Sequence, residues 1–354
     1  MHNPISKKKK RILLFLLIFL FLGISAVLLT FLSIRSKGDA ALARIQEMQT
    51  IPDLQLPETE DFSDAQEGLQ EGQVRYHGDV YTYNKDILTF LVLGIDKDEP
   101  VALAKDGISG GQSDGIFLVS LNPHTKTIKL LALNRNTMAL VDTYDKDGNF
   151  LKTRPMQITV QHGFGDGMDI SCRRSTMAVS RLLYQLPIAA YFSVNRGAIS
   201  AVNDAVGGVT VEVLNDIYYP ENGMVFQKGE MRHLRGREAF FYTATRNIHN
   251  FGSADLRLQR QRQYLSAFVS RFKQKAKINP FLPIRLYDRI SDYSVTDLGK
   301  SELVSLFSTA LGYTLDPKIY TPEGETVKGV HDLEEFHVDQ EALCRLMLEL
   351  FYEK

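Results

Sequence analysis

The chain has 354 residues, enough for one large domain or two ordinary ones. Its 41 Lys and Arg residues balance 42 Asp and Glu residues, so the composition does not support the basic surface that nucleic-acid-binding proteins present. Cys172 and Cys344 are the two cysteines. They could form one disulfide in an oxidising compartment, but they do not form a disulfide framework.

The first residues combine a basic run, Lys7–Arg11, with an uncharged and mostly apolar stretch at 12–34. A helix of that length spans roughly 35 Å at about 1.5 Å per residue, enough to cross a bilayer. A cleaved signal peptide is the alternative, with a weak cleavage site at Gly23–Ala26, but its apolar region normally covers about 7–15 residues. We therefore predict a single-pass transmembrane helix at 12–34. Residues 1–11 would form a cytoplasmic tail, and the rest of the chain would lie outside the cell membrane.

After the anchor, the composition changes twice. Residues 35–80 contain Pro52, Pro57 and an acidic stretch, and they are expected to form a solvated extracytoplasmic stalk. Residues 81–278 are expected to form the folded catalytic domain. Residues 279–354 are less regular and are expected to form a C-terminal extension that packs on the domain or follows it.

Apolar runs and turn signals predict the elements of the domain. Ile87–Ile95 is nearly continuously apolar, which is typical of a strand covered on both faces. Gly115–Leu121 and Thr127–Leu133 are two more strands, and the turn residues between them indicate a hairpin. Helices are then expected at Met177–Tyr184, Ile199–Val206, Arg235–Tyr242, Leu256–Lys275 and Gln340–Phe351, and strands at Ile188–Val194 and Val209–Val213. This alternation predicts an α/β fold, an α-β-α sandwich with a mixed central sheet, preceded by the transmembrane helix.

Two aspartates lie at the edges of predicted strands. Asp96 directly follows the first strand, and Asp114 precedes the second one after a glycine-rich loop. If the two carboxylates converge, they suit Mg²⁺ (or Mn²⁺), which often binds through one or two carboxylates plus phosphate oxygens. Taken alone, both residues are better explained as turn caps. The nearby histidines His162, His233 and His249 lack metal-ligand spacing and are interpreted as structural.

Arginines form the second feature. Arg135 follows an apolar strand without a charged neighbour, and Arg246 follows a predicted helix. On the next helix, Arg257 shares a face with Arg260 and with Gln261. Guanidinium groups match phosphate oxygens, although an ordinary basic surface helix is the alternative. Together with the anchor and the aspartates, these residues predict an extracytoplasmic site that holds a phosphate or pyrophosphate with a metal.

Around these residues the sequence resembles the LytR–CpsA–Psr family. The resemblance covers about residues 81–268 and depends on the order and spacing of several segments, none of which is specific alone. The segments are FLVLGID, GGQSDGIFLVSLNPHTKTIKLLALNRNTM, AVNDAVGGVTVEVLNDI, HLRGREAFFYTATR and ADLRLQRQRQYL. A further stretch, YDKDGNFLK…HGFGDGMDISC, resembles a branch of the family seen in gut Firmicutes.

The resemblance implies a phosphotransferase of cell-wall assembly. Such an enzyme moves an anionic glycopolymer, for example teichoic acid or capsule, from an undecaprenyl-pyrophosphate carrier to peptidoglycan with the help of Mg²⁺. The polyprenyl tail would occupy an apolar tunnel between sheet and helices. The resemblance also implies roles for single residues: metal binding by Asp96 and Asp114, catalysis by these two and Arg135, and pyrophosphate binding by Arg135, Arg246, Arg257, Arg260 and Gln261.

Five positions depart from the pattern of the family. Lys97-Asp98 stands in the vicinity of an arginine that commonly follows the first aspartate. Gln112 and Ala244 stand where the family usually has arginine, Asn136 where it usually has aspartate, and Asn134 where it usually has proline. Each lost charge-assisted hydrogen bond is worth roughly 1.5–3 kcal/mol. The departures therefore keep a second hypothesis open: a catalytically impaired protein that binds polyprenyl phosphates or acts as a scaffold in cell-wall assembly.

Overall fold

The computed structural model describes residues 29–54, 68–219, 223–246, 251–279, 281–329 and 333–354. Most of the transmembrane helix predicted at 12–34 lies outside these residues. Within the described ranges, no helix combines the length and the apolar character needed to cross a bilayer.

A six-stranded sheet forms the centre of the fold, with the strand order β13-β8-β3-β4-β5-β14. The pairs β3–β8 and β5–β14 are parallel and the other neighbours are antiparallel, which confirms the predicted mixed sheet. The predicted hairpin is also confirmed, because β4 and β5 pair directly. The strands are β3 (Leu88–Ile95), β4 (Ser113–Asn122), β5 (Thr127–Leu133), β8 (Ala190–Asn195), β13 (Ser294–Thr296) and β14 (Thr314–Tyr320).

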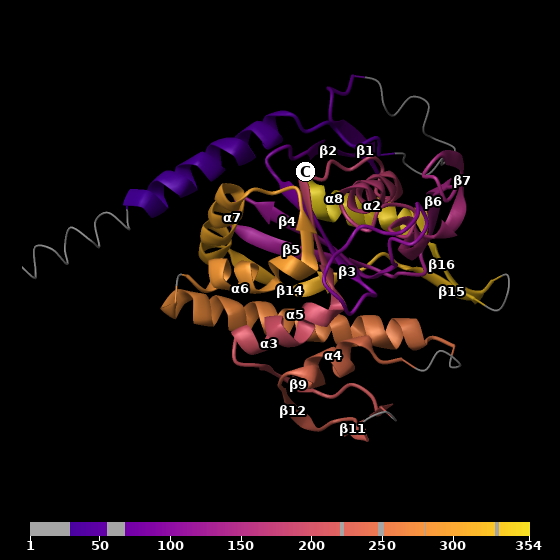
Figure 1. Ribbon diagram of the computed structural model, residues 1–354. Helices are drawn as coiled ribbons and strands as arrows, with labels where there is room; N and C mark the ends of the chain where they lie inside the picture. Colours follow the sequence, from indigo (N-terminus) through magenta and orange to yellow (C-terminus); the bar gives the residue numbers. More distant parts are fainter. Residues whose placement is uncertain (1–28, 55–67, 220–222, 247–250, 280, 330–332) are drawn as a thin grey trace, which may run out of the picture.

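Helices cover both faces of this sheet, as predicted for an α-β-α sandwich (Figure 1). Successive side chains of a strand point to opposite faces, so Leu91 packs in the core with α2 and α8, while Phe90 packs in the core with α5 and α7. Both cysteines are free and buried. The covering helices are α2 (Asp169–Leu182) and α8 (Gln340–Phe351) on one face, and α5 (Ser253–Ile278) and α7 (Lys300–Gly312) on the other.

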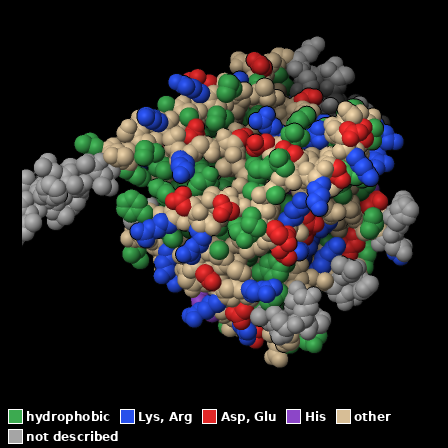
Figure 2. Space-filling model, viewed as in Figure 1, with side chains coloured by type: hydrophobic (Ala, Val, Ile, Leu, Met, Phe, Trp, Pro, Cys, Tyr) green, Lys and Arg blue, Asp and Glu red, His purple; other side chains and the backbone are tan. Residues whose placement is uncertain are grey.

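The remaining elements surround this sandwich. The predicted strand at Val209–Val213 is present, but it pairs with β12 outside the central sheet. Lys, Arg, Asp and Glu side chains are mixed over the face in Figure 2, in agreement with the near-neutral composition. The surrounding elements are β1 (Gln73–Tyr76), β2 (Asp79–Tyr83), β6 (Met138–Tyr144), β7 (Phe150–Gln157), η1 (Ile158–Gln161), η2 (Arg196–Ala198), α3 (Ile199–Ala205), β9 (Val209–Glu212), β10 (Ile217–Tyr219), β11 (Met224–Phe226), β12 (Met231–Leu234), α4 (Arg237–Ala244), α6 (Leu282–Ile290), η3 (Ser291–Tyr293), β15 (Gly324–Lys328), β16 (Glu334–Val338) and β17 (Tyr352–Glu353).

The expected solvated stalk at 35–80 differs from the structure in its described part. A helix covers residues 29–47, and its Leu42 is buried in the core with α7. Leu54 is also buried, and β1 pairs with β2, which in turn pairs with β17 near the C-terminus. These apolar side chains remove surface from water by packing on the domain, so the folded part begins before residue 81.

Residues 279–354 are not an extension but an integral part of the domain. They supply β13 and β14, which form the two edges of the central sheet. They also supply α8, whose Leu343 and Met347 are completely buried in the core. The strands of this segment are short, and β13 and β14 pair with β8 and β5, which lie far away in the sequence. The local sequence therefore shows no regular pattern that would identify them.

Leu343→Ala tests this integration. Leu343 is 0% exposed, so the substitution should leave a cavity and lower the free energy of unfolding by about 2–5 kcal/mol in denaturant titrations. Leu333→Ala, at a position that is 54% exposed in the same segment, is the matched control and should change it by less than about 0.5 kcal/mol. Equal effects of the two substitutions would contradict an integral C-terminal segment.

Candidate functional site

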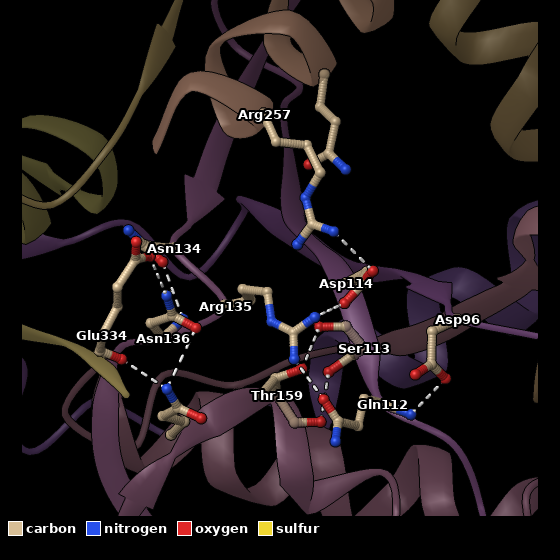
Figure 3. Close-up of polar contacts among 12 residues, drawn as sticks. Asp96, Gln112, Ser113, Asp114, Asn134, Arg135, Asn136, Thr159, Arg257 and Glu334 are labelled. Carbon is tan, nitrogen blue, oxygen red and sulfur yellow. Dashed lines mark hydrogen bonds and ion pairs between the residues drawn. The ribbon is translucent and has the colours of Figure 1, made fainter. Parts of the chain in front are cut away.

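Three predicted site residues meet at one end of the central sheet. In the antiparallel register, Ile95 at the end of β3 lies opposite Ser113 at the start of β4, and Ile116 lies opposite Leu133 at the end of β5. Asp96, Asp114 and Arg135, which follow or begin these strands, therefore lie in one region (Figure 3). Residues that sequence alone placed at separate strand edges thus form one site.

Asp114 is the centre of this site. Its Oδ1 accepts a hydrogen bond from Nη1 of Arg135, and its Oδ2 accepts one from Nη1 of Arg257 at 2.9 Å. Arg257 comes from the first part of α5, so this carboxylate joins the sheet to that helix (Figure 3). The side chains are 18% exposed for Asp114, 13% for Arg135 and 5% for Arg257, so solvent screens these ion pairs only weakly.

Gln112 connects Asp96 to the arginines. Its backbone N–H donates to Oδ1 of Asp96 at 2.7 Å, and its side-chain Oε1 accepts from Nη2 of Arg135. Figure 3 shows Gln112 between these two residues. Among the described residues, none donates a hydrogen bond to the other carboxylate oxygen of Asp96, Oδ2.

The positive charges of Arg135 and Arg257 are destabilised by burial and by neighbouring arginines. Burial lowers the pKa of the Arg135 guanidinium, and the charges of Arg257 and Arg246 lower it further. Burial likewise lowers the pKa of Arg257, again with a contribution from Arg246. In addition, Nε of Arg135 is buried and has no hydrogen-bond partner in the described part of the chain. A bound anion would relieve this repulsion and accept the free donor.

Arg260 and Gln261 point elsewhere. Arg260 donates from Nε to the carbonyl of Tyr242 at 2.8 Å and from Nη1 to Oδ1 of Asn215 at 2.9 Å. Its Nη2 donates to the carbonyl of Thr245, so its guanidinium joins α5 to the end of α4. Gln261 donates to the carbonyl of Thr243 at 3.2 Å. These two side chains hold backbone in place, whereas Arg135 and Arg257 converge on Asp114.

Glu334 is a site residue that sequence reasoning missed. Its Oε1 accepts the backbone N–H of Gly252, the residue before α5, at 2.8 Å. Its Oε2 accepts from Nδ2 of Asn136 at 3.1 Å, across 198 residues of sequence. Its charge partly opposes the lowering of the pKa of Arg135 and Arg257 that burial causes. Glu334 therefore places a carboxylate beside the neutral Asn136. No local sequence pattern predicts a contact between residues so far apart in the chain.

A second carboxylate strengthens the same connection. Asp255, in the first turn of α5, accepts from Nδ2 of Asn134 at 2.5 Å and from Oγ1 of Thr326 at 3.2 Å. Burial raises the pKa of Asp255, and the charge of Glu334 adds to this shift. The hairpin β15–β16, which carries Thr326 and Glu334, thus ties the turn after β5 to the start of α5. These are the two segments that supply Arg135 and Arg257.

Glu334→Ala tests this connection. It removes both hydrogen bonds of the carboxylate and should lower the free energy of unfolding by about 1.5–3 kcal/mol, since bonds to charged groups are strong. It should also weaken the binding of inorganic pyrophosphate, measured by calorimetry, because the two arginine-bearing segments lose their link. Glu325→Ala on the exposed part of the same hairpin is the control and should change neither quantity. If the two variants behave alike, the link does not hold the site.

Comparisons with known proteins add independent information. The LytR_cpsA_psr family model matches residues 57–343. Over 269 residues the chain is 26% identical to the polyisoprenyl-teichoic acid–peptidoglycan teichoic acid transferase TagU of Halalkalibacterium halodurans, covering 75% of this chain and 79% of that protein. Over 182 residues it is 31% identical to TagU of Bacillus mycoides, covering 50% of this chain and 54% of that protein. The chain thus matches only about half the length of the second relative.

The fold has counterparts among solved structures. The crystal structure of TagV from B. subtilis aligns with a TM-score of 0.57 and 25% sequence identity, covering 75% of this chain and 97% of that one. The family model, which spans most of the chain, includes every residue of the site described above. The chain belongs to the LytR–CpsA–Psr family.

Proposed function

We propose that this protein transfers an anionic glycopolymer from a polyisoprenyl-pyrophosphate carrier, such as undecaprenyl pyrophosphate, to peptidoglycan. The observation that carries the proposal is the pair of largely buried arginines, Arg135 and Arg257, on the two oxygens of Asp114. Teichoic acid is the glycopolymer named for the relatives TagU, and capsule polymers share its anionic chemistry. The polyisoprenyl tail would lie in an apolar tunnel between the sheet and the helices.

The charges of the site support a pyrophosphate as the ligand. Two largely buried guanidinium groups, with Arg246 acting on both, repel one another in the absence of an anion. A pyrophosphate offers several oxygens for bidentate contacts and carries enough negative charge to offset this repulsion. Donors that are held in position before the reaction stabilise the charge that develops when the lipid phosphate leaves.

The site offers two carboxylates, those of Asp96 and Asp114, as ligands for Mg²⁺. Among the described residues, no group of three or more His, Cys, Asp or Glu side chains converges on one point. Mg²⁺ nevertheless binds through one or two carboxylates when phosphate oxygens and waters complete its shell. Asp96 and Asp114 would hold it through lone pairs that the hydrogen bonds to their oxygens leave available, and Oδ2 of Asp96 would remain for the acceptor hydroxyl. When bound, the ion would offset negative charge on the phosphates.

The transfer itself is a substitution at phosphorus. The oxygen of the acceptor hydroxyl bonds to the phosphorus next to the glycopolymer, and the bond from this phosphorus to the bridging oxygen breaks. Polyisoprenyl phosphate leaves with that oxygen. We assign Asp96 as the group that accepts the hydroxyl proton, because both oxygens of Asp114 already accept from arginines.

The location of the protein forms part of the proposal. Residues 12–34 would anchor it in the cell membrane, with the N-terminus in the cytoplasm and the domain outside. A carrier lipid and the peptidoglycan would then both be within reach of the site.

Asp96→Ala and Arg135→Ala test the function. In an assay of the full chain with a polyisoprenyl-pyrophosphate-linked glycopolymer and Mg²⁺, each substitution should lower kcat/KM by about a hundredfold or more. A chelator should abolish turnover, and added Mg²⁺ should restore it. Arg154→Ala, on the exposed strand β7, is the control arginine and should have no effect. Tight binding of the lipid without turnover under several divalent metals would reject the transferase and favour the scaffold.

A further inference from the structure

A pocket of about 330 Å³ is lined by Asp96 and Gln112. The glycine-rich loop before β4 contributes Ile108 and Ser109 to its wall, and the segment after β7 contributes Val160 and Phe164. This volume lies within the range of about 300–1,000 Å³ that is typical of small-molecule sites.

Hydrogen bonds hold the two walls together. The backbone N–H of Gly110 donates to the carbonyl of Gly163 at 3.0 Å. Below them, Nδ1 of the buried His162 lies 3.1 Å from the carbonyl oxygen of Gly110 and 3.2 Å from that of Gly111. Because both neighbours are acceptors, this nitrogen carries the proton. A Cβ at Gly110 would lie 2.4 Å from the carbonyl oxygen of His162, so only glycine allows this approach.

Phe164 is held from the other side. Nη1 of Arg174 donates to its carbonyl oxygen at 2.9 Å, while the guanidinium of Arg174 stacks on the ring of Tyr144 at 3.3 Å. The pocket is therefore formed before any ligand arrives, and a ligand would not need to order its walls.

The charge of the pocket differs from that of the arginine site. Among the residues that line it, all of them described, Asp96 alone is charged. Lys97, which lies close to the loop, donates its Nζ to the carbonyl of Ser109 at 2.9 Å. Arg135 and Arg257 are directed at Asp114 instead. The lining thus offers nothing to hold a second anion.

The groups that remain available match a sugar ring. Asp96 presents its Oδ2 as an acceptor, and Nε2 of Gln112 donates no hydrogen bond to a described residue. The half-buried ring of Phe164 supplies an apolar wall, which suits the C–H face of a pyranose. Acceptor, donor and apolar surface lie around one pocket.

We propose that this pocket binds the acceptor as a neutral sugar unit of a glycan strand, with one hydroxyl hydrogen-bonded to Asp96. The inference rests on the proposed function and extends it by naming where the second substrate lies. Gln112 then separates the two substrates: its side-chain oxygen accepts from Arg135, which faces the phosphates, and its backbone N–H donates to the aspartate that faces the acceptor.

Direct binding to the full chain in detergent tests the pocket. The probe is a tetrasaccharide of N-acetylglucosamine, the neutral sugar of the peptidoglycan glycan strand, titrated by calorimetry in the absence of any carrier lipid. Phe164→Ala removes the apolar wall and should raise Kd roughly tenfold. Ile108→Trp at the 40% exposed rim fills the pocket without disturbing the core and should also raise Kd. Phe150→Ala, at an exposed aromatic residue of β7, is the control and should leave Kd unchanged.

The outcomes separate this inference from the proposed function. If the wild-type protein does not bind the tetrasaccharide, or if both pocket variants bind as tightly as wild type, the acceptor pocket is rejected. Turnover of the carrier-linked glycopolymer, measured on the same preparation, tests the transferase independently. Tetrasaccharide binding that is sensitive to both variants supports the pocket even in a preparation that does not turn over.

Discussion

The structure of the site depends on one largely buried carboxylate, Asp114, and the two guanidinium groups that share it. A buried charge costs several kcal/mol unless it is paired, so the two arginines and the aspartate have to be brought together or left exposed. They come from the central hairpin and from α5, and their pairing fixes this helix across the end of the sheet. The carboxylate offsets two positive charges only in part, which leaves the site ready for a phosphate anion.

The neutral residues Gln112 and Asn136 have definite partners in this arrangement. Gln112 offers its amide oxygen to Arg135, so the guanidinium keeps a hydrogen bond although no further charge is added. Asn136 donates to Glu334, whose carboxylate comes from the hairpin β15–β16. Ala244 has no comparable compensation in the described contacts. Hydrogen bonds therefore give Gln112 and Asn136 partners although both residues are neutral where the family usually has a charged residue. A site of this kind suits a ligand with a different charge.

The C-terminal segment has a larger role than its irregular sequence indicates. It forms both edges of the central sheet, fills one face of it with α8, and supplies Glu334 and Thr326 to the segments that carry the arginines. A domain that ended at residue 278 would lose β14 beside β5 and β13 beside β8, as well as these contacts. Folding of the sheet and assembly of the site are in this sense one event.

By itself, the sequence determined the elements whose signal is local. Apolar periodicity and turn residues identified β3, the β4–β5 hairpin, most helices and the α/β class, and strand ends located Asp96, Asp114 and Arg135. Only the tertiary structure decided that Arg260 binds backbone carbonyls while Arg257 reaches Asp114, and that Glu334 lies beside Asn136. The physical reason is range. Periodicity reports which face of an element is buried, whereas a contact across 198 residues exists only after distant elements have packed.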